Sequence, residues 1–460
     1  MLKVEILLTR SFIFFRKIEA TPWRSAIAER RLKPSRPVID LANIVFAQDV
    51  QRSTQSERRL TYMLWSVSSF FCEIVSCIMG NKNAYRGVVM SNAVMLEEKI
   101  YQWFDHFHKY PEVSWKEFET TKKIASILDE LNVSYRLLGD VPGLIAEIGT
   151  GDEIVAVRAD IDALWQEVDG KWQANHSCGH DANITMVLGA LLLLKDRPLQ
   201  HRVRFIFQPA EELGNGACAA FERGAVEGVS HLFGVHLRPI EELPLGKVSP
   251  AIHHGAAYFL EGTIRGTDAH GARPHQGKNA IDVIMAVQQM LNSIHLSPFE
   301  PHSAKLTKIV ADGGSTNIIP GTASFSMDIR AQRNNQLELL RSRIEFGLTS
   351  IKQQFEIDMG WEWLDFTPGA EVSSVAARMA KDAIIETLGE THLVGEITTP
   401  GSDDFHFYTV KKPELKATMI GIGADLTPGL HHPKMTFDRN ALIDAAKVLA
   451  CVLEKKPEYE

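Results

Sequence analysis

The stretch His176-Ser177-Cys178-Gly179-His180-Asp181, followed by an apolar run from Ile184 to Leu194, decides how the chain is interpreted. It places a thiol and an imidazole two residues apart where a tight loop enters an apolar helix, a position that can hold a cation. The adjacent Asp181 could accept a hydrogen bond from an imidazole and select its tautomer, as outer carboxylates do at metal sites. A Cys-x-His pair alone is weak evidence, because a free cysteine is usually a small buried hydrophobe. A metal site therefore needs further ligands from elsewhere in the chain.

The composition is that of an ordinary globular protein. The chain has 460 residues, of which 45% are hydrophobic and 23% charged, enough for two or three domains. Its five cysteines follow no framework spacing, which argues against a disulfide scaffold and for a reducing compartment, the cytoplasm. The acidic body of the chain lacks a basic face, so we expect no nucleic-acid partner.

The first 94 residues differ from the rest. They contain 14 Lys and Arg against 7 Asp and Glu, a net charge of +7 that leaves −15 for residues 95–460. Charged residues interrupt the apolar start, which makes a poor signal peptide. The apolar run 62–80 carries Glu73 and four serines and is short for a hydrocarbon layer of about 30 Å. We expect residues 1–94 to be a poorly ordered or non-native extension with Met90 or Met95 as the natural start; a membrane anchor is the less favoured alternative.

Residues 95–256 and 367–460 have the pattern of an α/β domain. Strands are expected at 153–159, 202–207 and 231–236, each followed by polar residues, and helices alternate with them. This order predicts a doubly wound mixed sheet with its ligand site at the carboxyl edge of the strands. The segments 144–148 and 153–159 are expected to form a hairpin or two neighbouring strands. Ser114-Trp115-Lys116-Glu117 has the form of a capping box that opens a helix ending near Leu131.

Residues 257–366 have a different order of elements. Strands are expected at 258–265, 304–311, 322–330 and 357–364, and helices at 279–294 and 336–354. The resulting βαββαβ order is that of a ferredoxin-like domain. We expect it to be inserted into the α/β domain, whose chain resumes at about residue 367.

The adjacent carboxylates Glu211 and Glu212 follow the predicted strand 202–207 and Gln-Pro-Ala. An isolated Glu-Glu pair is usually a solvated turn. In a cluster with nitrogen and sulfur donors, one carboxylate can bind a metal while its neighbour accepts a proton from metal-bound water, whose pKa the cation lowers to about 7. Glu212 and Glu211 are candidates for these two roles.

Two further histidines could complete such a site. His236 closes the predicted strand 231–236, and His431 lies in a Gly- and Pro-rich loop near the C-terminus. Each alone is more often an ordinary polar residue than a ligand. With Cys178, His180 and Glu212 they form a mixed sulfur, nitrogen and oxygen set large enough for two ions. Such a set suits Zn²⁺, Mn²⁺ or Co²⁺ better than Ca²⁺ or Mg²⁺.

Eight ordered motifs make the chain resemble a known family over about residues 96–455. They are Arg158-Ala159-Asp160-Ile161-Asp162-Ala163, Cys178-Gly179-His180-Asp181, Phe207-Gln208-Pro209-Ala210-Glu211-Glu212, Phe233-Gly234-Val235-His236, residues 268–275 (DAHGARPH), 314–320 (GSTNIIP), 401–405 (GSDDF) and 430–433 (LHHP). In this order they are similar to the signatures of the peptidase M20 amidohydrolases. The resemblance is to the branch that contains N-acyl amino acid amidohydrolases, hippurate hydrolase and auxin-conjugate hydrolases.

The resemblance implies a role for each matching residue. Cys178, His180, Glu212, His236 and His431 would bind two divalent metal ions per subunit, and Glu211 would be the general base. Asp160 and Asp181 would lie behind them, Asp160 orienting a ligand. Family members usually form homodimers through the inserted domain, which serves as lid and dimerisation domain. His270 would then reach the partner's active site to stabilise the oxyanion or hold substrate, and Asn317 and Arg330 would line the same cleft.

We therefore expect a cytoplasmic metallo-amidohydrolase that cleaves the amide bond of an N-acyl amino acid or related small conjugate. One alternative is a dipeptidase or carboxypeptidase of the same fold. A more distant alternative is a non-catalytic metal-binding scaffold, which is disfavoured because it has no use for a second carboxylate beside Glu212.

Overall fold

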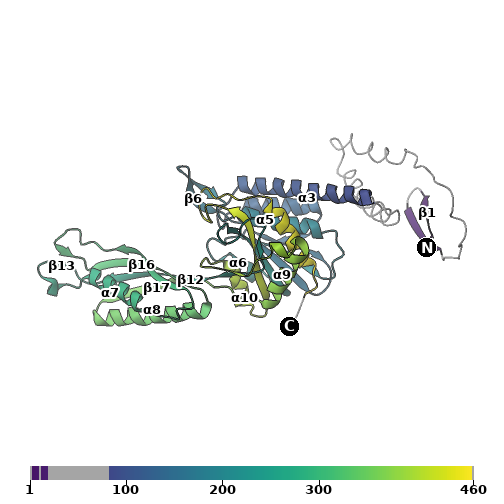
Figure 1. Ribbon diagram of the computed structural model, residues 1–460. Coiled ribbons are helices and arrows are strands. Elements are labelled where there is room, and N and C mark those ends of the chain that lie inside the picture. The colour runs from purple at the N-terminus through teal and green to yellow at the C-terminus, as the bar shows by residue number, and fades with distance from the viewer. Residues whose placement is uncertain (1–2, 10–11, 19–81, 458–460) are drawn as a thin grey trace. The chain divides into compact units, whose positions relative to one another are not determined.

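The computed structural model describes residues 3–9, 12–18 and 82–457 (Figure 1). The chain divides into two units at Val89. In the first unit, β1 (Lys3–Thr9) pairs antiparallel with β2 (Phe12–Ile18). The run 62–80, considered above as a membrane anchor, lies outside the described residues. Of the helices that are described, none has the length and apolar character needed to span a bilayer.

A seven-stranded mixed sheet forms the centre of the second unit, in the order β10-β19-β9-β5-β8-β4-β3. Its four central strands, β5, β8, β9 and β19, run parallel, and β3, β4 and β10 are antiparallel to their neighbours. The strands are β3 (Tyr135–Leu137), β4 (Leu144–Gly149), β5 (Ile154–Asp160), β8 (Arg202–Gln208), β9 (Val229–Pro239), β10 (Val248–Ser249) and β19 (Lys416–Leu426). The expected doubly wound mixed sheet is therefore confirmed, and the carboxyl ends of four strands share one edge.

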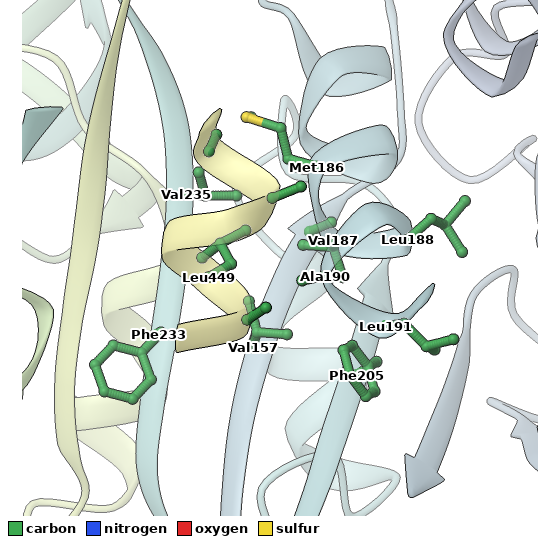
Figure 2. Packing of buried hydrophobic residues seen from close by; sticks show 14 of the residues in the cluster. Val157, Met186, Val187, Leu188, Ala190, Leu191, Phe205, Phe233, Val235 and Leu449 are labelled. Atoms are coloured by element: carbon green, nitrogen blue, oxygen red, sulfur yellow. The ribbon is translucent and has the colours of Figure 1, made fainter. Parts of the chain in front are cut away.

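Alternating side chains of the central strands pack into two hydrophobic clusters on opposite faces of the sheet. Val155 and Val157 of β5 belong to the cluster that contains helices α3 (Lys82–Lys109), α4 (Phe118–Leu131), α5 (His180–Leu194), α9 (Ser374–Leu388) and α11 (Ala441–Glu454). Figure 2 shows Val157, Phe205 and Phe233 of the strands against α5 and Leu449 of α11. Ile154 and Ala156 belong to the other cluster, with α6 (Gly216–Glu222) and residues around α10 (Phe407–Lys411). The two-residue period of a strand accounts for this division.

The expectation that segments 144–148 and 153–159 are neighbouring strands is wrong. Strand β8 lies between β4 and β5, antiparallel to the first and parallel to the second. Every residue of β5 is buried, as expected of a strand with neighbours on both edges and helices on both faces. The short connection after β4 therefore carries the chain past one strand position.

The capping box at residues 114–117 is also wrong. Helix α4 begins at Phe118, and Glu117 occupies the N-cap position without a side-chain capping hydrogen bond. Glu112 caps the first turn instead, because its Oε2 accepts hydrogen bonds from the backbone N of Thr120 at 2.7 Å and from the Thr120 hydroxyl at 2.8 Å. The side chains of Ser114 and Glu117 are thus available for other contacts.

Residues 256–367 form a separate four-stranded antiparallel sheet in the order β14-β16-β12-β17. Its elements are β12 (Ala256–Arg265), α7 (Ala280–Ser293), β14 (His302–Val310), β16 (Thr322–Ala331), α8 (Asn334–Gln354) and β17 (Asp358–Thr367). Both helices cover the same face of this sheet (Figure 1), and buried residues such as Leu260, Phe325 and Leu348 give it a hydrophobic core of its own. The order of strands and helices confirms the ferredoxin-like inserted domain.

Candidate metal centre

The candidate ligands meet at the carboxyl edge of the parallel strands. His236 lies near the end of β9, Glu212 follows β8, and His431 follows β19. Cys178 and His180 flank Gly179, the N-cap residue of α5, whose φ of +88° is a backbone conformation that favours glycine. The backbone N–H of His431 donates a hydrogen bond of 2.7 Å to the carbonyl of Ser177, which brings the C-terminal loop to the Cys178 loop.

The ligand atoms form two adjoining groups that share one thiol. Atoms of Cys178, His180 and His236 lie within 4.8 Å of one another, as do atoms of Cys178, Glu212 and His431. The Sγ of Cys178 is 3.6 Å from Nε2 of His236, and Nε2 of His431 is 3.5 Å from Oε2 of Glu212. Two adjoining groups of potential ligand atoms that share a sulfur could hold a pair of cations.

The hydrogen bonds of two imidazoles leave their Nε2 atoms free to act as ligands. Nδ1 of His236 donates to the carbonyl oxygen of Leu237 at 2.7 Å, and Nδ1 of His180 lies 3.0 Å from the carbonyl oxygen of Asp162. Since a carbonyl can only accept, each Nδ1 carries a hydrogen, so Nε2 is the nitrogen of each ring that could offer a lone pair to a cation. Nε2 of His180 and Oε1 of Glu212 are buried without a hydrogen-bond partner among the described residues.

Burial shapes the protonation of these groups. It lowers the pKa of His236 to about 4, so that this imidazole is neutral, and it raises the pKa of Glu212 to about 7. It also raises the pKa of the Cys178 thiol well above its ordinary value. Divalent cations would favour the thiolate and carboxylate forms that burial disfavours. Thiolate, imidazole and carboxylate ligands together suit Zn²⁺ and similar divalent ions. The donor set therefore fits two such ions.

Glu211 belongs to neither of the two groups that share Cys178, but one of its carboxylate oxygens lies within 4.8 Å of potential ligand atoms of His180 and Glu212. Its Oε2 is 3.8 Å from Nε2 of His180, whereas its Oε1 accepts a hydrogen bond from the backbone N of Asp404 at 3.4 Å. Burial raises the pKa of Glu211 well above its ordinary value, and the charges of Asp403 and Glu212 add to the effect. One carboxylate oxygen is thus held by the backbone, while the other faces the candidate ligands.

Asp160 and Asp181 are both buried close to the candidate ligands. Asp162 reaches Nδ1 of His180 at 3.2 Å, and Oδ2 of Asp160 lies 3.8 Å from Nε2 of the same ring. Asp160 also accepts hydrogen bonds from Arg158 and from Asn183. Asp181 does contact an imidazole, but it is that of His108, with Nδ1 and Oδ2 2.7 Å apart. His108 is on α3 and outside the candidate ligand set.

The three residues expected to line a substrate cleft all belong to the inserted domain. His270, on the short strand β13 (Ala269–His270), is exposed, and its Nδ1 accepts from the backbone N of Ala272 at 3.1 Å. The side-chain oxygen of Asn317 accepts from the Ser315 hydroxyl at 2.8 Å. Arg330 is paired with Asp328 at 2.9 Å, and its Nη1 donates to the carbonyl of Pro400 at 3.4 Å. None of the described ligand groups includes these residues.

Sequence reasoning missed a buried network behind the site. The Arg158 guanidinium, 1% exposed, bridges the carboxylates of Asp160 and Asp404. Asp403 and Asp404 each also share a group of potential ligand atoms with Glu211. Asp162, Asp403 and Asp404 all stood within recognised motifs, but nothing in the local pattern distinguished them from their neighbours.

Comparison with known proteins agrees with this geometry. The model of peptidase family M20/M25/M40 matches residues 156–455. An N-acetylcysteine deacetylase of Bacillus subtilis is 31% identical over 371 residues, which cover 75% of this chain and 93% of that protein. The IAA-amino acid hydrolase ILR1-like 4 of Arabidopsis thaliana is 33% identical over 325 residues, covering 65% and 72% of the two chains.

A solved structure from the same family is also similar to this chain. The YXEP protein of Bacillus subtilis, described as a dinuclear metal binding peptidase from the M20 family, superposes with a TM-score of 0.66 at 25% sequence identity. The match covers 78% of this chain and 98% of that one. The family match extends over more than half of the chain and includes every strand that carries a candidate ligand. The chain therefore belongs to peptidase family M20/M25/M40 and is a hydrolase that acts on amide bonds.

Proposed function

We propose that the protein is a two-metal amidohydrolase that cleaves the amide bond of N-acyl amino acids or related small conjugates. The observation that carries this proposal is the pair of ligand groups that share the Cys178 thiol, with the separate carboxylate of Glu211 3.8 Å from His180. A metal-binding scaffold would need the ligands but not this additional acid.

Cys178, His180, Glu212, His236 and His431 would hold the two cations, for which we propose Zn²⁺, Mn²⁺ or Co²⁺. When bound, such ions lower the pKa of water and polarise a carbonyl oxygen. The hydrogen bonds at Nδ1 of His180 and His236 keep Nε2 of each ring available to the ions.

Glu211 would act as the general base and then as the general acid. The backbone N of Asp404 holds Oε1, so Oε2 is the oxygen that would accept a proton from the attacking water and later give it to the leaving amine. A carboxyl group that burial keeps easy to protonate suits this exchange, because a catalytic acid or base works best with a pKa near the working pH.

The relatives support the proposed substrate class. One is named for N-acetylcysteine and another for amino acid conjugates of IAA. Both names describe a small acyl group on an amino acid. The first alternative, a dipeptide or a peptide C-terminus, keeps the same chemistry and differs in what the cleft accepts.

We further propose that the chain from residue 95 onward forms two domains. The α/β catalytic domain consists of residues 95–256 and 367–460, and the inserted domain consists of residues 257–366. The inserted domain would form a homodimer, in which His270 of one subunit, with Asn317 and Arg330, contacts substrate. Its outer strand β14 supports this, because Ile309 and Val310 are each 53% exposed at the sheet edge.

The spacing of the cysteines supports a cytoplasmic location.

The test is a hydrolysis assay on the purified chain loaded with Mn²⁺, Zn²⁺ or Co²⁺. The panel contains N-acetyl and N-benzoyl amino acids together with dipeptides. We expect faster release of the amino acid from the N-acyl substrates. Faster cleavage of the dipeptides would favour the peptidase alternative, and no hydrolysis of any substrate would favour the scaffold.

A further inference from the structure

The side chains of Ser114 and Glu117 do not cap helix α4. Each contacts a residue that lies next to the candidate metal ligands. The Ser114 hydroxyl donates to Oδ2 of Asp162 at 2.6 Å. Oε1 of Glu117 accepts a hydrogen bond of 2.8 Å from the backbone N of Ala210, the residue before Glu211. Glu117 is completely buried. Neither contact serves the helix, whose first turn is capped by Glu112.

Ala210 belongs to the turn that carries Glu211 and Glu212. Its φ is +52°, in the left-handed region that residues with a Cβ rarely adopt unless the surroundings impose it. Glu117 binds its N–H, and its carbonyl accepts from the backbone N of Gly216 at 3.2 Å. A Cβ at Gly216 would lie 1.7 Å from the carbonyl oxygen of Pro209, so the chain closes tightly there. The turn is therefore held from both sides.

Asp162 connects Ser114 to the same turn. The Oδ2 that receives the Ser114 hydroxyl also accepts a hydrogen bond of 3.0 Å from the backbone N of Glu212. Its Oδ1 lies 3.2 Å from Nδ1 of His180. One carboxylate thus joins the segment before α4 to a candidate ligand on α5 and to the backbone of another after β8.

From these contacts we propose that Glu117, with Ser114 in support, is a positioning residue for the catalytic acid and its metal ligands. Glu117 fixes Ala210 in the conformation that directs Glu211 toward the cations, and Ser114 fixes the carboxylate of Asp162 that orients His180 and Glu212. The inference rests on the proposed function, because Glu211 is the base of that reaction. Outer contacts of this kind commonly govern metal affinity and activity by about 10- to 100-fold.

The protonation of Glu117 shows which substitution preserves its role. Burial, with the nearby charge of Asp162, raises the pKa of Glu117 to about 8, so the group is mostly a neutral acid at pH 7. Its Oε2 is buried without a hydrogen-bond partner among the described residues. Glutamine is also neutral and of the same shape, and its amide oxygen can accept the Ala210 N–H. Alanine cannot accept it.

The test compares Glu117→Ala, Glu117→Gln and Ser114→Ala with the parent chain. Glu119→Gln, on the exposed side of the same helix, is the matched control. Co²⁺ affinity is measured from visible absorption, and kcat and KM are measured with all sites filled. For Glu117→Ala we expect Co²⁺ binding weaker, and kcat lower, by about 10- to 100-fold, with little change in KM. Ser114→Ala should shift both quantities in the same direction.

Rescue by the conservative variant separates positioning from bulk packing. Glu117→Gln should lie within about threefold of the parent, because the hydrogen bond to Ala210 survives with similar net strength. If Glu117→Ala fails to fold, the other two variants still test the proposal. Glu117→Gln should then behave like the parent, and Ser114→Ala should show weaker Co²⁺ binding and a lower kcat. Parent-like kcat and affinity in Glu117→Ala, or a Glu117→Gln variant as impaired as the alanine variant, would overturn the proposal.

The two readouts also separate this proposal from the proposed function. An active parent whose kcat and Co²⁺ affinity are the same in every variant would overturn the positioning role alone. A parent that hydrolyses nothing, but whose Co²⁺ affinity falls in Glu117→Ala and recovers in Glu117→Gln, would support the positioning role and overturn the function. A parent that binds no Co²⁺ would overturn both.

Discussion

The backbone N–H of His431 donates a hydrogen bond of 2.7 Å to the carbonyl of Ser177, so the loop after β19 is joined to the loop that carries Cys178. This contact brings Cys178 and His431 into one ligand group, although the whole inserted domain separates them in sequence. The same hydrogen bond fixes the backbone of His431, which has a φ of +64°, although about half of its side chain is exposed.

Replacing Glu211 by Gln should reduce kcat by about 10²- to 10⁴-fold, because general acid–base catalysis contributes about that much. Metal content, measured by elemental analysis, should stay at the parent value, since Glu211 is outside the two ligand groups that share Cys178. Glu222→Gln, an exposed position on α6, is the control and should behave like the parent. A Glu211→Gln enzyme with nearly full activity would remove this residue from the mechanism.

Replacing Cys178 by Ala should impair both metal positions at once, because its thiol belongs to both ligand groups. We expect bound metal to fall well below two ions per chain and activity to be lost with it. Cys218→Ser provides the control, since Cys218 is a free, partly exposed cysteine on α6. Two tightly bound ions in Cys178→Ala would show that the sulfur is not the shared ligand.

The His108–Asp181 pair should stabilise the fold in a pH-dependent way. The hydrogen bond that His108 donates to Asp181 raises the pKa of His108 above its ordinary value, although burial opposes the shift. A raised folded-state pKa means that the stabilisation is complete below about pH 6.5, the unfolded value. It is lost as the pH rises through the folded value.

A His108→Gln variant should therefore lose more stability at pH 5.5 than at pH 8.5. Since the His108 side chain is 55% exposed, solvent screening limits the difference to about 1 kcal/mol or less. Urea denaturation of the parent and the variant at both pH values measures it. An equal loss at both pH values would mean that the pair contributes without its charge.

Replacing Gly189 by Ala should destabilise the catalytic domain by about 1–3 kcal/mol, as overpacking of a core does. A Cβ at this position in α5 would lie 2.8 Å from Cβ of Ala446 on α11 and 3.0 Å from Cδ1 of Ile100. The clash should outweigh the better helix propensity of alanine, which favours it by about 1 kcal/mol. Thermal unfolding of the two proteins would show the sign, and a more stable variant would mean that the helices can separate at little cost.

The sequence predicted most of the fold because the relevant signals are local. The periodicity of residues 202–207 and 231–236, and the βαββαβ order of residues 257–366, depend on neighbouring residues alone. The candidate ligands were recognisable because Cys178 precedes a helix, Glu212 follows a strand and His236 lies near the end of one.

The errors concern contacts between distant segments. Strand β8 lies between β4 and β5, although nothing in the two outer strands indicates an intervening partner. Ser114 and Glu117 satisfy the local rule for a capping box, but each side chain hydrogen-bonds to a residue from another part of the chain instead. A local rule that is broken near a site is itself a sign of function.

The most direct measurement of the central claim is a crystal structure of the Co²⁺-loaded protein, with the ions located by anomalous scattering. The account predicts two ions about 3.5–4 Å apart, the spacing of two-metal sites. The Sγ of Cys178 should be bound to both ions, and Glu211 should be bound to neither. A single ion, or two ions with Cys178 uncoordinated, would contradict it.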